Sequence, residues 1–430
     1  MLAKTKKVVI VGGGFAGINL AKKLMKSSLF EVILVDKNNY NFFPPLIYQV
    51  ATGFLENSSI SYPFRKLFAA KRLRFRMGNV KRVLLQEKQI ELDTGILDYD
   101  YLVFATGTET NYFGNQNIRQ NALPMKTLDD ALFMRNTLLQ RLERATVTKD
   151  KQEKERLLTI VVAGGGPTGV EISGMLAELK KSVIRKEYPE LIGAKSDIYL
   201  VNGGAELLSP MSVKSQQYTY QSLANLGVKI LLNTRVNDFK DNKVVLGNGE
   251  VIETESLIWA SGVKGISFDG LPQEVYGPGT RMLVDRFNRI KDCEDVYSIG
   301  DACLILDDPE YPRGHPQLAQ VAIQQGVNLA LNLINKESAK QQNPFMYRDR
   351  GSMAIIGKNK AVADLPFKKI HFDGFIAWCA WLFIHMMSLL NYRNRLKTLY
   401  NWAVAYFTRD NSLRMIIRPG GKKQEAEQQN

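Results

Sequence analysis

One arrangement, an apolar strand followed by a glycine loop and a helical segment, occurs twice in this chain of 430 residues. In both copies a second strand ends at a polar residue, and a third strand ends in small residues and glycine. The repeated segments are 7–11, 12–17, 31–36 and 101–107 in the first copy, and 158–163, 164–169, 198–202 and 256–262 in the second. Their common order and nearly constant offset predict two copies of one supersecondary unit. Because strands alternate with helices, each copy is expected to form a parallel, doubly wound, Rossmann-like sheet, so the predicted fold class is α/β.

The composition excludes several other classes of protein. Hydrophobic residues make up 45% and charged residues 23% of the chain, which is typical of globular domains and not of disordered or fibrous proteins. At about 100–200 residues per domain, the length predicts two to four domains. The three cysteines form no CxxC pair and there are only three histidines, so neither a disulfide framework nor a metal site is expected.

Each glycine loop is a candidate site for a dinucleotide. Glycines after a strand let the backbone approach a pyrophosphate, whose charge is favoured by the N-terminus of the following helix. Two loops in this context predict two dinucleotides; the alternative is that either loop is only a tight turn. Asp36 ends the second strand of the first copy, where an acid binds a ribose hydroxyl, and the strand 295–299 leads into Gly300 and Asp301. Since Asp301 is placed to accept from a ribityl chain, unless it is only a helix N-cap, the first copy is expected to hold FAD and the second a nicotinamide nucleotide.

Asn202 occupies the position in the second copy that corresponds to Asp36. An acid there would bind the adenosine ribose of NADH and repel the 2′-phosphate of NADPH. Asparagine keeps a hydrogen bond without that repulsion, and no Lys or Arg follows directly in 203–205 to attract the phosphate. We therefore expect NADH as the substrate, with weaker discrimination against NADPH than an acid would give.

Several segments resemble those of the type II NADH:quinone oxidoreductases, which are single-subunit NADH dehydrogenases that do not pump protons. The resemblance extends from Lys7 to about Ile417. It rests on the segments 38–53, 110–114, 166–171, 319–325 and 351–357. The segment 319–325, Ala-Gln-Val-Ala-Ile-Gln-Gln, is similar to the stretch assigned to quinone binding in that family. The resemblance implies a flavoprotein that oxidises NADH through non-covalent FAD and reduces a membrane quinone in a respiratory chain, although an acid is usual in the family at the position of Asn202.

Three residues are candidates for a catalytic role, namely Glu171, Gln320 and Gln324. The two glutamines are four residues apart, so on a helix they share one face, where their amides suit a quinone carbonyl. Glutamines that satisfy nearby backbone groups are the alternative. The resemblance assigns Glu171 to proton delivery or nucleotide positioning near the flavin. The alternative is a carboxylate stabilised by the helix N-terminus, worth roughly 0.3–1 kcal/mol.

The cofactor-binding predictions combine the glycine loops, the strand ends and the resemblance. The residues predicted to bind FAD are Gly12, Gly14, Phe15, Ala16, Gly17, Asp36, Lys37, Val80, Ala105, Thr106, Gly107, Asp301 and Gln320. The residues predicted to bind NADH are Gly164, Gly166, Thr168, Gly169, Glu171, Asn202, Ser261 and Gly262.

The segment 373–418 is predicted to lie on a membrane surface. Its apolar run, 375–390, is shorter than the roughly 20 residues that a bilayer span needs. A second stretch, 396–407, has apolar residues at helical spacing, and Lys and Arg far outnumber acids between 391 and 423. Two aromatic, cationic helices too short to span are typical of an in-plane membrane anchor. A buried helical hairpin or a homodimer interface is the alternative.

These predictions divide the chain into an FAD-binding domain at 1–115 and 266–335, an NADH-binding domain at 116–265, the C-terminal region at 336–418 and a disordered tail at 419–430. The expected location is the cytoplasmic face of a bacterial inner membrane, or the equivalent inner face of an organelle membrane. Nucleic acid is not an expected partner, because no motif accompanies the basic residues between Glu56 and Glu87. The alternative function is that of a soluble NAD(P)H flavoprotein resembling ferredoxin reductases, with a protein or other acceptor.

Overall fold

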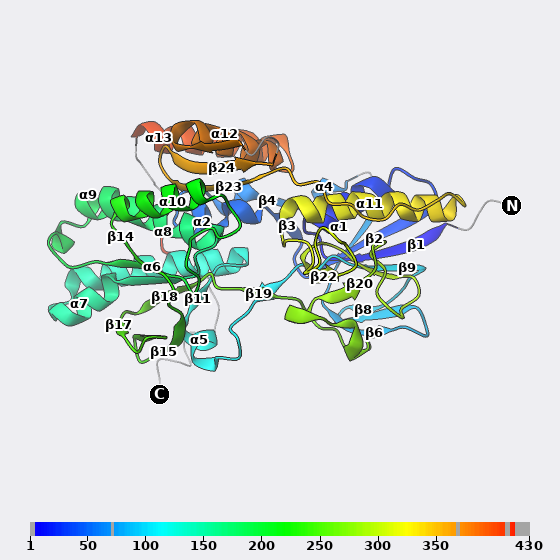
Figure 1. Cartoon of the computed structure of the whole chain (residues 1–430), viewed down its shortest axis with the longest axis horizontal. Helices are drawn as coiled ribbons and strands as arrows, with labels where there is room; N and C mark the ends of the chain where they lie inside the picture. Colours follow the sequence, from blue (N-terminus) through cyan, green and yellow to red (C-terminus); the bar gives the residue numbers. More distant parts are fainter. Residues whose placement is uncertain (1–4, 70–72, 367–369, 409–412, 418–430) are drawn as a thin grey trace. The chain divides into compact units, whose positions relative to one another are not determined.

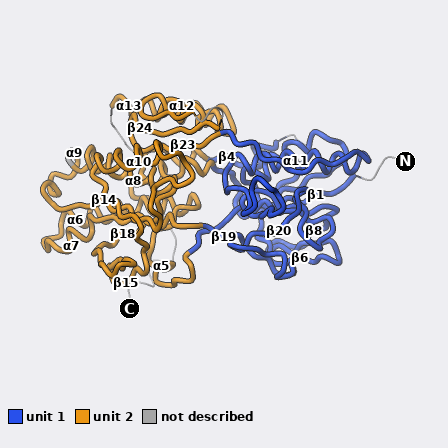
Figure 2. Tube along the Cα trace, viewed as in Figure 1, with its two compact units in different colours: residues 1–42, 61–111, 263–350 blue, residues 43–60, 112–262, 351–430 orange. Residues whose placement is uncertain are grey.

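The computed structural model describes residues 5–69, 73–366, 370–408 and 413–417, so the predicted disordered tail at 419–430 lies outside the described residues. The chain forms two compact units, shown in different colours in Figure 2. Unit 1 comprises Met1–Phe42, Ser61–Asn111 and Val263–Arg350, and unit 2 comprises Phe43–Ile60, Tyr112–Gly262 and Gly351–Asn430. The segment 43–60 thus belongs to unit 2, although it lies inside the predicted range 1–115. The predicted domain boundaries stay a prediction.

A five-stranded parallel sheet forms the centre of unit 1. In spatial order its strands are β21 (Val296–Ser298), β9 (Tyr101–Phe104), β1 (Lys6–Val11), β2 (Phe30–Asp36) and β5 (Leu73–Met77). Four of the strands are largely apolar and buried because both faces of such a sheet are covered, whereas arginines alternate with apolar residues in the edge strand β5. Two helices, α1 (Phe15–Leu24) and α11 (Ala319–Glu337), pack against each other in this unit (Figure 1). A Cβ atom on Gly326 would lie 2.4 Å from the carbonyl oxygen of Ala16, so only glycine permits this approach.

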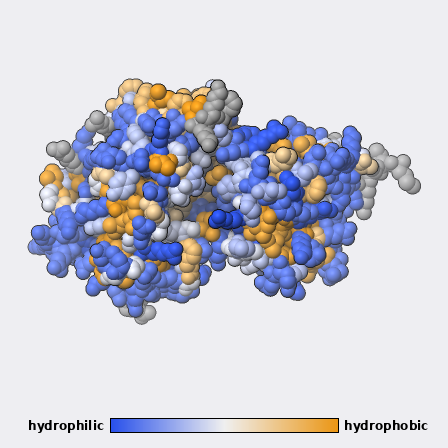
Figure 3. All heavy atoms as spheres, viewed as in Figure 1, coloured by the Kyte–Doolittle hydropathy of each residue, from blue (hydrophilic) through white to orange (hydrophobic). Residues whose placement is uncertain are grey.

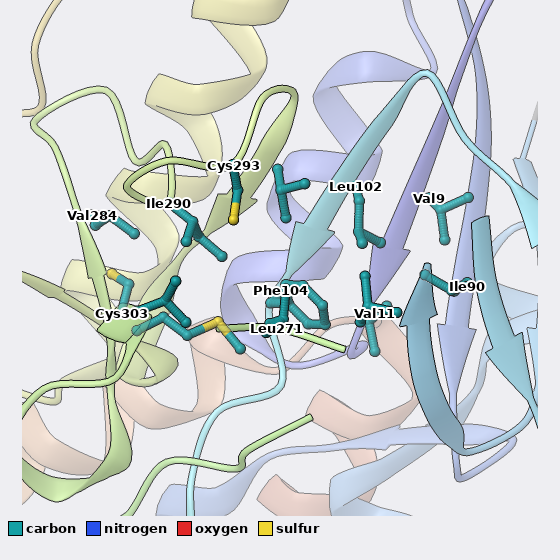
Figure 4. Packing of buried hydrophobic residues seen from close by; sticks show 14 of the residues in the cluster. Val9, Val11, Ile90, Leu102, Phe104, Leu271, Val284, Ile290, Cys293 and Cys303 are labelled. Carbon is teal, nitrogen blue, oxygen red and sulfur yellow. The ribbon is translucent and has the colours of Figure 1, made fainter. Parts of the chain in front are cut away.

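Smaller sheets complete unit 1, and a buried apolar cluster joins some of their strands to the central sheet. The smaller elements are β3 (Tyr40–Phe42), β4 (Ser61–Pro63), α4 (Phe64–Leu67), β6 (Val80–Leu84), β7 (Gln89–Leu92), β8 (Gly95–Asp98), β10 (Glu109–Thr110), β19 (Val263–Lys264), β20 (Met282–Val284) and β22 (Cys303–Ile305). Figure 4 shows Val11, Leu102 and Phe104 in this cluster together with Cys293 and Cys303. Both cysteines are therefore core residues, and neither is in a disulfide.

Unit 2 repeats the architecture of unit 1. Its parallel sheet has the spatial order β11 (Leu123–Pro124), β18 (Ser256–Trp259), β12 (Ile160–Ala163), β13 (Ile198–Val201) and β14 (Val228–Leu231). In each sheet, the strand that leads into the glycine loop (β1 or β12) thus lies between the strand that follows the loop helix (β2 or β13) and the strand that ends in small residues (β9 or β18). The helices of this part are α5 (Gln116–Asn121), α6 (Leu128–Val147), α7 (Lys151–Leu158), α8 (Pro167–Leu179), α9 (Arg185–Glu187) and α10 (Val213–Leu226), beside a small antiparallel sheet of β15 (Val236–Lys240), β16 (Lys243–Leu246) and β17 (Val251–Glu253).

The C-terminal part of unit 2 is an antiparallel sheet followed by two helices. It consists of β23 (Ser352–Gly357), β24 (Lys360–Leu365), β25 (Ile370–Asp373), α12 (Gly374–Ser388) and α13 (Tyr392–Thr408). Helix α8 packs closely on β23. Only glycine fits at position 174, because a Cβ there would lie 1.7 Å from the carbonyl oxygen of Ile356. Helix α13 contacts α3 (Asn57–Ile60), which follows α2 (Ile47–Ala51) in the segment 43–60. None of the helices in the described part of the chain has the length and apolar character needed to cross a membrane.

Candidate functional site

The glycine loop of unit 1 forms an open cradle at the N-terminus of α1. Gly12 has φ +104°, and a Cβ there would lie 2.4 Å from the carbonyl oxygen of Ala105, so the loop needs glycine at this crossing. Gly14 is the N-cap of α1, and no side chain caps the helix. A Cβ on Gly14 would meet nothing within 4 Å. The uncapped helix end therefore faces open space, which suits a pyrophosphate group.

Asp36 anchors this loop from the end of β2. One carboxylate oxygen accepts from the backbone N–H of Gly13 over 2.7 Å, and the other accepts from that of Asn38 over 2.8 Å. Burial raises the pKa of Asp36, while these two hydrogen bonds act in the opposite direction. Each carboxylate oxygen has a further lone pair, so Asp36 can also accept from a ribose hydroxyl. Two further predicted residues lie at strand ends: Lys37 is exposed just after β2, and Val80 is half-buried at the start of β6.

The ends of β9 and β21 complete the unit 1 site. The hydroxyl oxygen of Thr106 is buried and has no hydrogen-bond partner, and a Cβ on Gly107 would meet nothing within 4 Å. Ile299 donates its backbone N–H to the carbonyl oxygen of Phe104, which brings Asp301 to the same edge of the sheet. An unsatisfied buried hydroxyl and open space follow β9, and the carboxylates of Asp36 and Asp301 lie at the ends of β2 and β21. This set of groups fits the polar groups of FAD. These residues, together with the cradle at Gly14, would hold that cofactor.

Gln325 belongs to this edge of the sheet, although the predicted site residues do not include it. Its side-chain oxygen accepts from the backbone N–H of Gly300 over 2.6 Å, and both residues are buried. Gly300 has φ +74°, so the turn that presents Asp301 is held by one glycine and one buried amide. Gln325 belongs to the segment 319–325 that the sequence singles out, but its partner Gly300 follows a strand that is distant in the sequence.

The glycine loop of unit 2 has the same geometry. Gly164 has φ +115°, and a Cβ there would lie 2.5 Å from the carbonyl oxygen of Ala260. Gly166 is the N-cap of α8, and a Cβ on it would meet nothing within 4 Å. Gly169 closes the turn, since a Cβ would lie 1.8 Å from the carbonyl oxygen of Gly164. This second cradle suits the pyrophosphate of a nicotinamide nucleotide.

The remaining predicted residues of this site lie at the edges of the cradle. Thr168 is half-buried in the first turn of α8, and Ser261 and Gly262 follow the end of β18. The ring of Phe113 lies over Gly262, where an added Cβ would come within 2.8 Å of it.

Asn202 has a role that an acid could not take over. Its side-chain oxygen accepts from the backbone N–H of Gly165 over 3.1 Å, as Asp36 does in the first loop. Its amide group donates to the carbonyl oxygens of Gly204 and Glu206 over 3.1 and 2.9 Å. An aspartate would instead turn an acceptor toward two acceptors. Asparagine thus folds the loop after β13.

Glu171 is buried in α8, and its surroundings keep it protonated. Burial raises the pKa of Glu171 to about 8, and only a long 3.5 Å hydrogen bond from the backbone N–H of Ile355 opposes this. The charge on Glu171 also contributes to the raised pKa of the buried Tyr48, after burial itself. A carboxyl group with a pKa near 8 can take up and release a proton at neutral pH.

Gln320 and Gln324 lie four residues apart on α11 and are both half-buried. The side-chain oxygen of Gln320 accepts from the backbone N–H of Arg350 over 2.9 Å. Gln324 accepts from the backbone N–H of Arg348 and donates to its carbonyl oxygen, over 3.0 and 2.9 Å. Both amides thus bond the backbone of the segment between α11 and β23, as the alternative interpretation of their spacing expects, and their role toward a quinone stays a prediction.

An aromatic cluster on α12 and α13 consists of residues that the predicted site does not include. Trp402 donates its indole N–H to the side-chain oxygen of the buried Gln49 over 2.8 Å. His385 stacks on Trp381 at 3.9 Å between ring centroids and donates Nδ1–H to the Trp381 carbonyl oxygen over 2.8 Å. Burial lowers the pKa of His385 to about 4, so its ring is neutral at pH 7 and Nε2 is an acceptor.

The cysteines do not provide a second redox centre. Cys293, Cys303 and Cys379 are all unpaired, and burial raises the pKa of Cys303 to about 11. A thiol with so high a pKa is a poor nucleophile. Across the described ranges, no cluster of His, Cys, Asp and Glu could hold a metal ion.

Comparison with known proteins places this geometry in a defined class. The family model for pyridine nucleotide-disulphide oxidoreductases matches residues 6–326, and that for the NDH2 C-terminal domain matches residues 350–410. The type II NADH:quinone oxidoreductase Ndh of Mycobacterium tuberculosis is 32% identical, and the match covers 94% of this chain and 88% of that protein. An internal alternative NAD(P)H-ubiquinone oxidoreductase A1 of Arabidopsis thaliana mitochondria is 30% identical, with 95% and 87% covered.

Solved structures show the same fold. The structure of NDH2 from Plasmodium falciparum in complex with NADH superposes with a TM-score of 0.87 and 22% identity, covering 96% of this chain and 100% of that one. The class is therefore that of the pyridine nucleotide-disulphide oxidoreductases, with two dinucleotide-binding units. Within it, the chain belongs to the type II NADH:quinone oxidoreductases. The predicted fold, the use of FAD and NADH, and the NADH:quinone oxidoreductase activity are confirmed at the level of this family.

Proposed function

We propose that this chain oxidises NADH in unit 2, uses FAD held in unit 1, and reduces a membrane quinone while it lies on a membrane surface. The observation that carries the proposal is the pair of glycine cradles, because each places open space beside an uncapped helix N-terminus. FAD, when bound, supplies the redox chemistry between the nicotinamide and the quinone. The protein supplies binding, orientation and protons.

The named residues take separate roles in this proposal. Asp36 and Asp301 bind hydroxyl groups of FAD, and Thr106 donates its unpartnered hydroxyl to the same cofactor. Glu171 holds a proton in the buried interior of α8 and releases it to the reduced acceptor. Gln320 orients the quinone head, since its amide N–H groups can donate to a quinone carbonyl oxygen while its side-chain oxygen accepts from Arg350.

An anaerobic titration tests the activity. NADH should bleach the visible absorbance of the flavin, and a soluble quinone should then restore it rapidly. Bleaching without recovery would contradict the quinone assignment and favour a protein acceptor. The variant Gln320→Ala should slow only the recovery step, and Asn328→Ala, on the same helix, is the matched control.

The surface of α12 and α13 is proposed as the membrane-binding face. Figure 3 shows hydrophobic residues gathered over these helices. Exposed apolar side chains on the two helices are Phe375, Ile376, Phe383, Ile384, Met387, Tyr392, Leu396, Leu399, Tyr400 and Phe407. Such a surface, with cationic residues on α13, suits the interface of a bilayer with anionic lipid. We place it on the cytoplasmic face of a bacterial inner membrane, or on the equivalent inner face of an organelle membrane.

Flotation with vesicles of mixed neutral and anionic lipid tests this face. The triple variant Phe375→Ser/Ile376→Ser/Phe383→Ser should bind such vesicles at least roughly tenfold more weakly, since losing the burial of even one of these side chains costs about 1.5 kcal/mol. The matched control changes Ile192 and Val213 to serine, because these are equally exposed apolar residues elsewhere in unit 2. A homodimer that covers the same face would appear as doubled mass in detergent-free light scattering, and the triple variant would then become monomeric.

A further inference from the structure

Arg235 lies directly over the glycine that follows Asn202. The residue is in the loop between β14 and β15, and its side chain is exposed. A Cβ built on Gly203 would lie 2.9 Å from Cγ and 3.1 Å from Nε of Arg235. The arginine side chain therefore rests against the backbone of Gly203, in space that any other residue at 203 would occupy.

Backbone hydrogen bonds hold the two loops together. Thr234 donates its N–H to the carbonyl oxygen of Asn202, and Asn233 donates to that of Gly204, both over 3.0 Å. The carbonyl oxygen of Arg235 accepts from the N–H of Gly247 over 2.8 Å. The position of Arg235 is thus set by the main chain on both sides. Within the described ranges, no carboxylate forms an ion pair with its guanidinium group.

The charge at this edge of the sheet differs from that of an NADH-specific site. The end of the second strand after a glycine loop is where the adenosine ribose of a dinucleotide binds. In unit 1 that position carries the carboxylate of Asp36. In unit 2 it carries the neutral Asn202, whose amide hydrogens are used by Gly204 and Glu206. The carboxylate in the following loop, 203–208, is that of Glu206, and its side chain is exposed.

We propose that Arg235 binds the 2′-phosphate of NADPH, so that the nucleotide site of unit 2 accepts NADPH as well as NADH. A guanidinium group matches a phosphate with two parallel hydrogen bonds, and here it stands without a competing ion pair. This inference rests on the proposed function, because it requires that unit 2 binds a nicotinamide nucleotide.

Equilibrium binding to the FAD-loaded protein tests the inference without turnover. The probes are 2′,5′-ADP and 5′-AMP, which differ only in the 2′-phosphate, and calorimetry gives their Kd values. Arg235→Ala should weaken the binding of 2′,5′-ADP roughly tenfold and leave 5′-AMP unchanged, as expected for one charge-assisted contact. Arg235→Lys should retain part of the affinity. Lys240→Ala, an exposed cation on β15, is the control for the loss of one positive charge.

The outcomes are distinct for the two proposals. Equal weakening of both probes by Arg235→Ala, or no change in either, would overturn the role of Arg235 and leave the proposed function intact. Failure of the parent protein to bind 5′-AMP and NAD⁺ would overturn the proposed nucleotide site itself.

Discussion

Trp402 donates its indole N–H to the side-chain oxygen of Gln49 over 2.8 Å, and this bond joins α13 to the segment 43–60. Gln49 is buried and donates in turn to the hydroxyl oxygen of Tyr48 over 2.8 Å. The bond explains why a segment that lies between two strands of unit 1 in the sequence packs as part of unit 2.

Replacing one partner of this bond should cost more than replacing both. Gln49→Leu leaves the indole N–H buried without an acceptor, and Trp402→Phe leaves the amide oxygen without its donor, each at about 1–3 kcal/mol. Urea unfolding of the parent, the two single variants and the double variant gives the interaction free energy between Gln49 and Trp402. Strictly additive losses of free energy of unfolding would show that the bond contributes nothing of its own.

Glu171→Gln should change how stability depends on pH. In the unfolded chain this carboxyl group ionises near its ordinary pKa of 4.5, whereas in the folded protein burial raises the pKa to about 8. Between these values the folded state keeps a proton that the unfolded state has lost, so stability falls as the pH rises, by up to about 1.4 kcal/mol per pH unit. The variant has no such group. Its gain in free energy of unfolding relative to the parent should therefore be absent near pH 4.5 and largest at pH 8 and above.

Thermal unfolding at several pH values measures this difference, with Glu250→Gln at an exposed turn as the control. A constant difference in free energy of unfolding between parent and Glu171→Gln across this range would contradict the raised pKa.

The variant Glu171→Gln should also slow turnover with NADH and quinone while its FAD content stays unchanged. Unaltered turnover would leave Glu171 with a structural role alone.

Gly326→Ala should destabilise the protein, although alanine normally favours a helix over glycine by about 1 kcal/mol. The added methyl group would lie 2.4 Å from the carbonyl oxygen of Ala16, so α11 would have to move away from α1. Since α1 begins at the FAD cradle, the flavin absorbance per protein should fall. Gly174→Ala makes the same kind of clash with Ile356 in unit 2 and should lose stability while it retains flavin. Full FAD content in Gly326→Ala would contradict this coupling.

Gln325→Leu should weaken FAD binding through the turn at Gly300. The variant leaves the buried N–H of Gly300 without an acceptor, at a cost of about 1–3 kcal/mol. The Kd of FAD, measured by reconstitution of the flavin-free protein, should therefore increase roughly tenfold or more. Gln324→Leu, which loses the two side-chain hydrogen bonds to the backbone of Arg348, serves as the comparison. The explanation fails if the two variants bind FAD equally well.

The sequence predicts the parts of the fold that depend on local pattern. The strand, glycine loop and helix after Val11 and after Ala163 are encoded in adjacent residues, so their positions follow from periodicity and glycine chemistry. Of the two C-terminal helices, α12 is indicated by its apolar run and α13 by its helical spacing of apolar residues. In each of these cases the interactions that define the element lie within a few residues of one another.

The remaining features depend on contacts between distant residues. The partner of Gln325 is Gly300, and Arg235 reaches Gly203 from a loop more than 30 residues further along the chain. In the sequence, Asn202 is recognisable only as an asparagine where an acid is usual. Its hydrogen bonds to the carbonyl oxygens of Gly204 and Glu206 are seen only in the folded loop. The sequence offers stabilisation of a charged Glu171 by the helix N-terminus as an alternative, but α8 begins at Pro167, so Glu171 lies beyond the first turn. β23 covers the side chain, and the resulting burial decides its protonation.

The division of each unit into three stretches of chain has a consequence for biosynthesis. Unit 1 needs α11, and unit 2 needs Trp402, so neither core can close while the N-terminal half alone has left the ribosome. Nascent chains will therefore expose apolar strands until translation is nearly finished, a state in which aggregation competes with folding. Overproduction at low temperature, or with added chaperone capacity, should accordingly raise the yield of this protein more than it would for a chain whose two units follow one another in sequence.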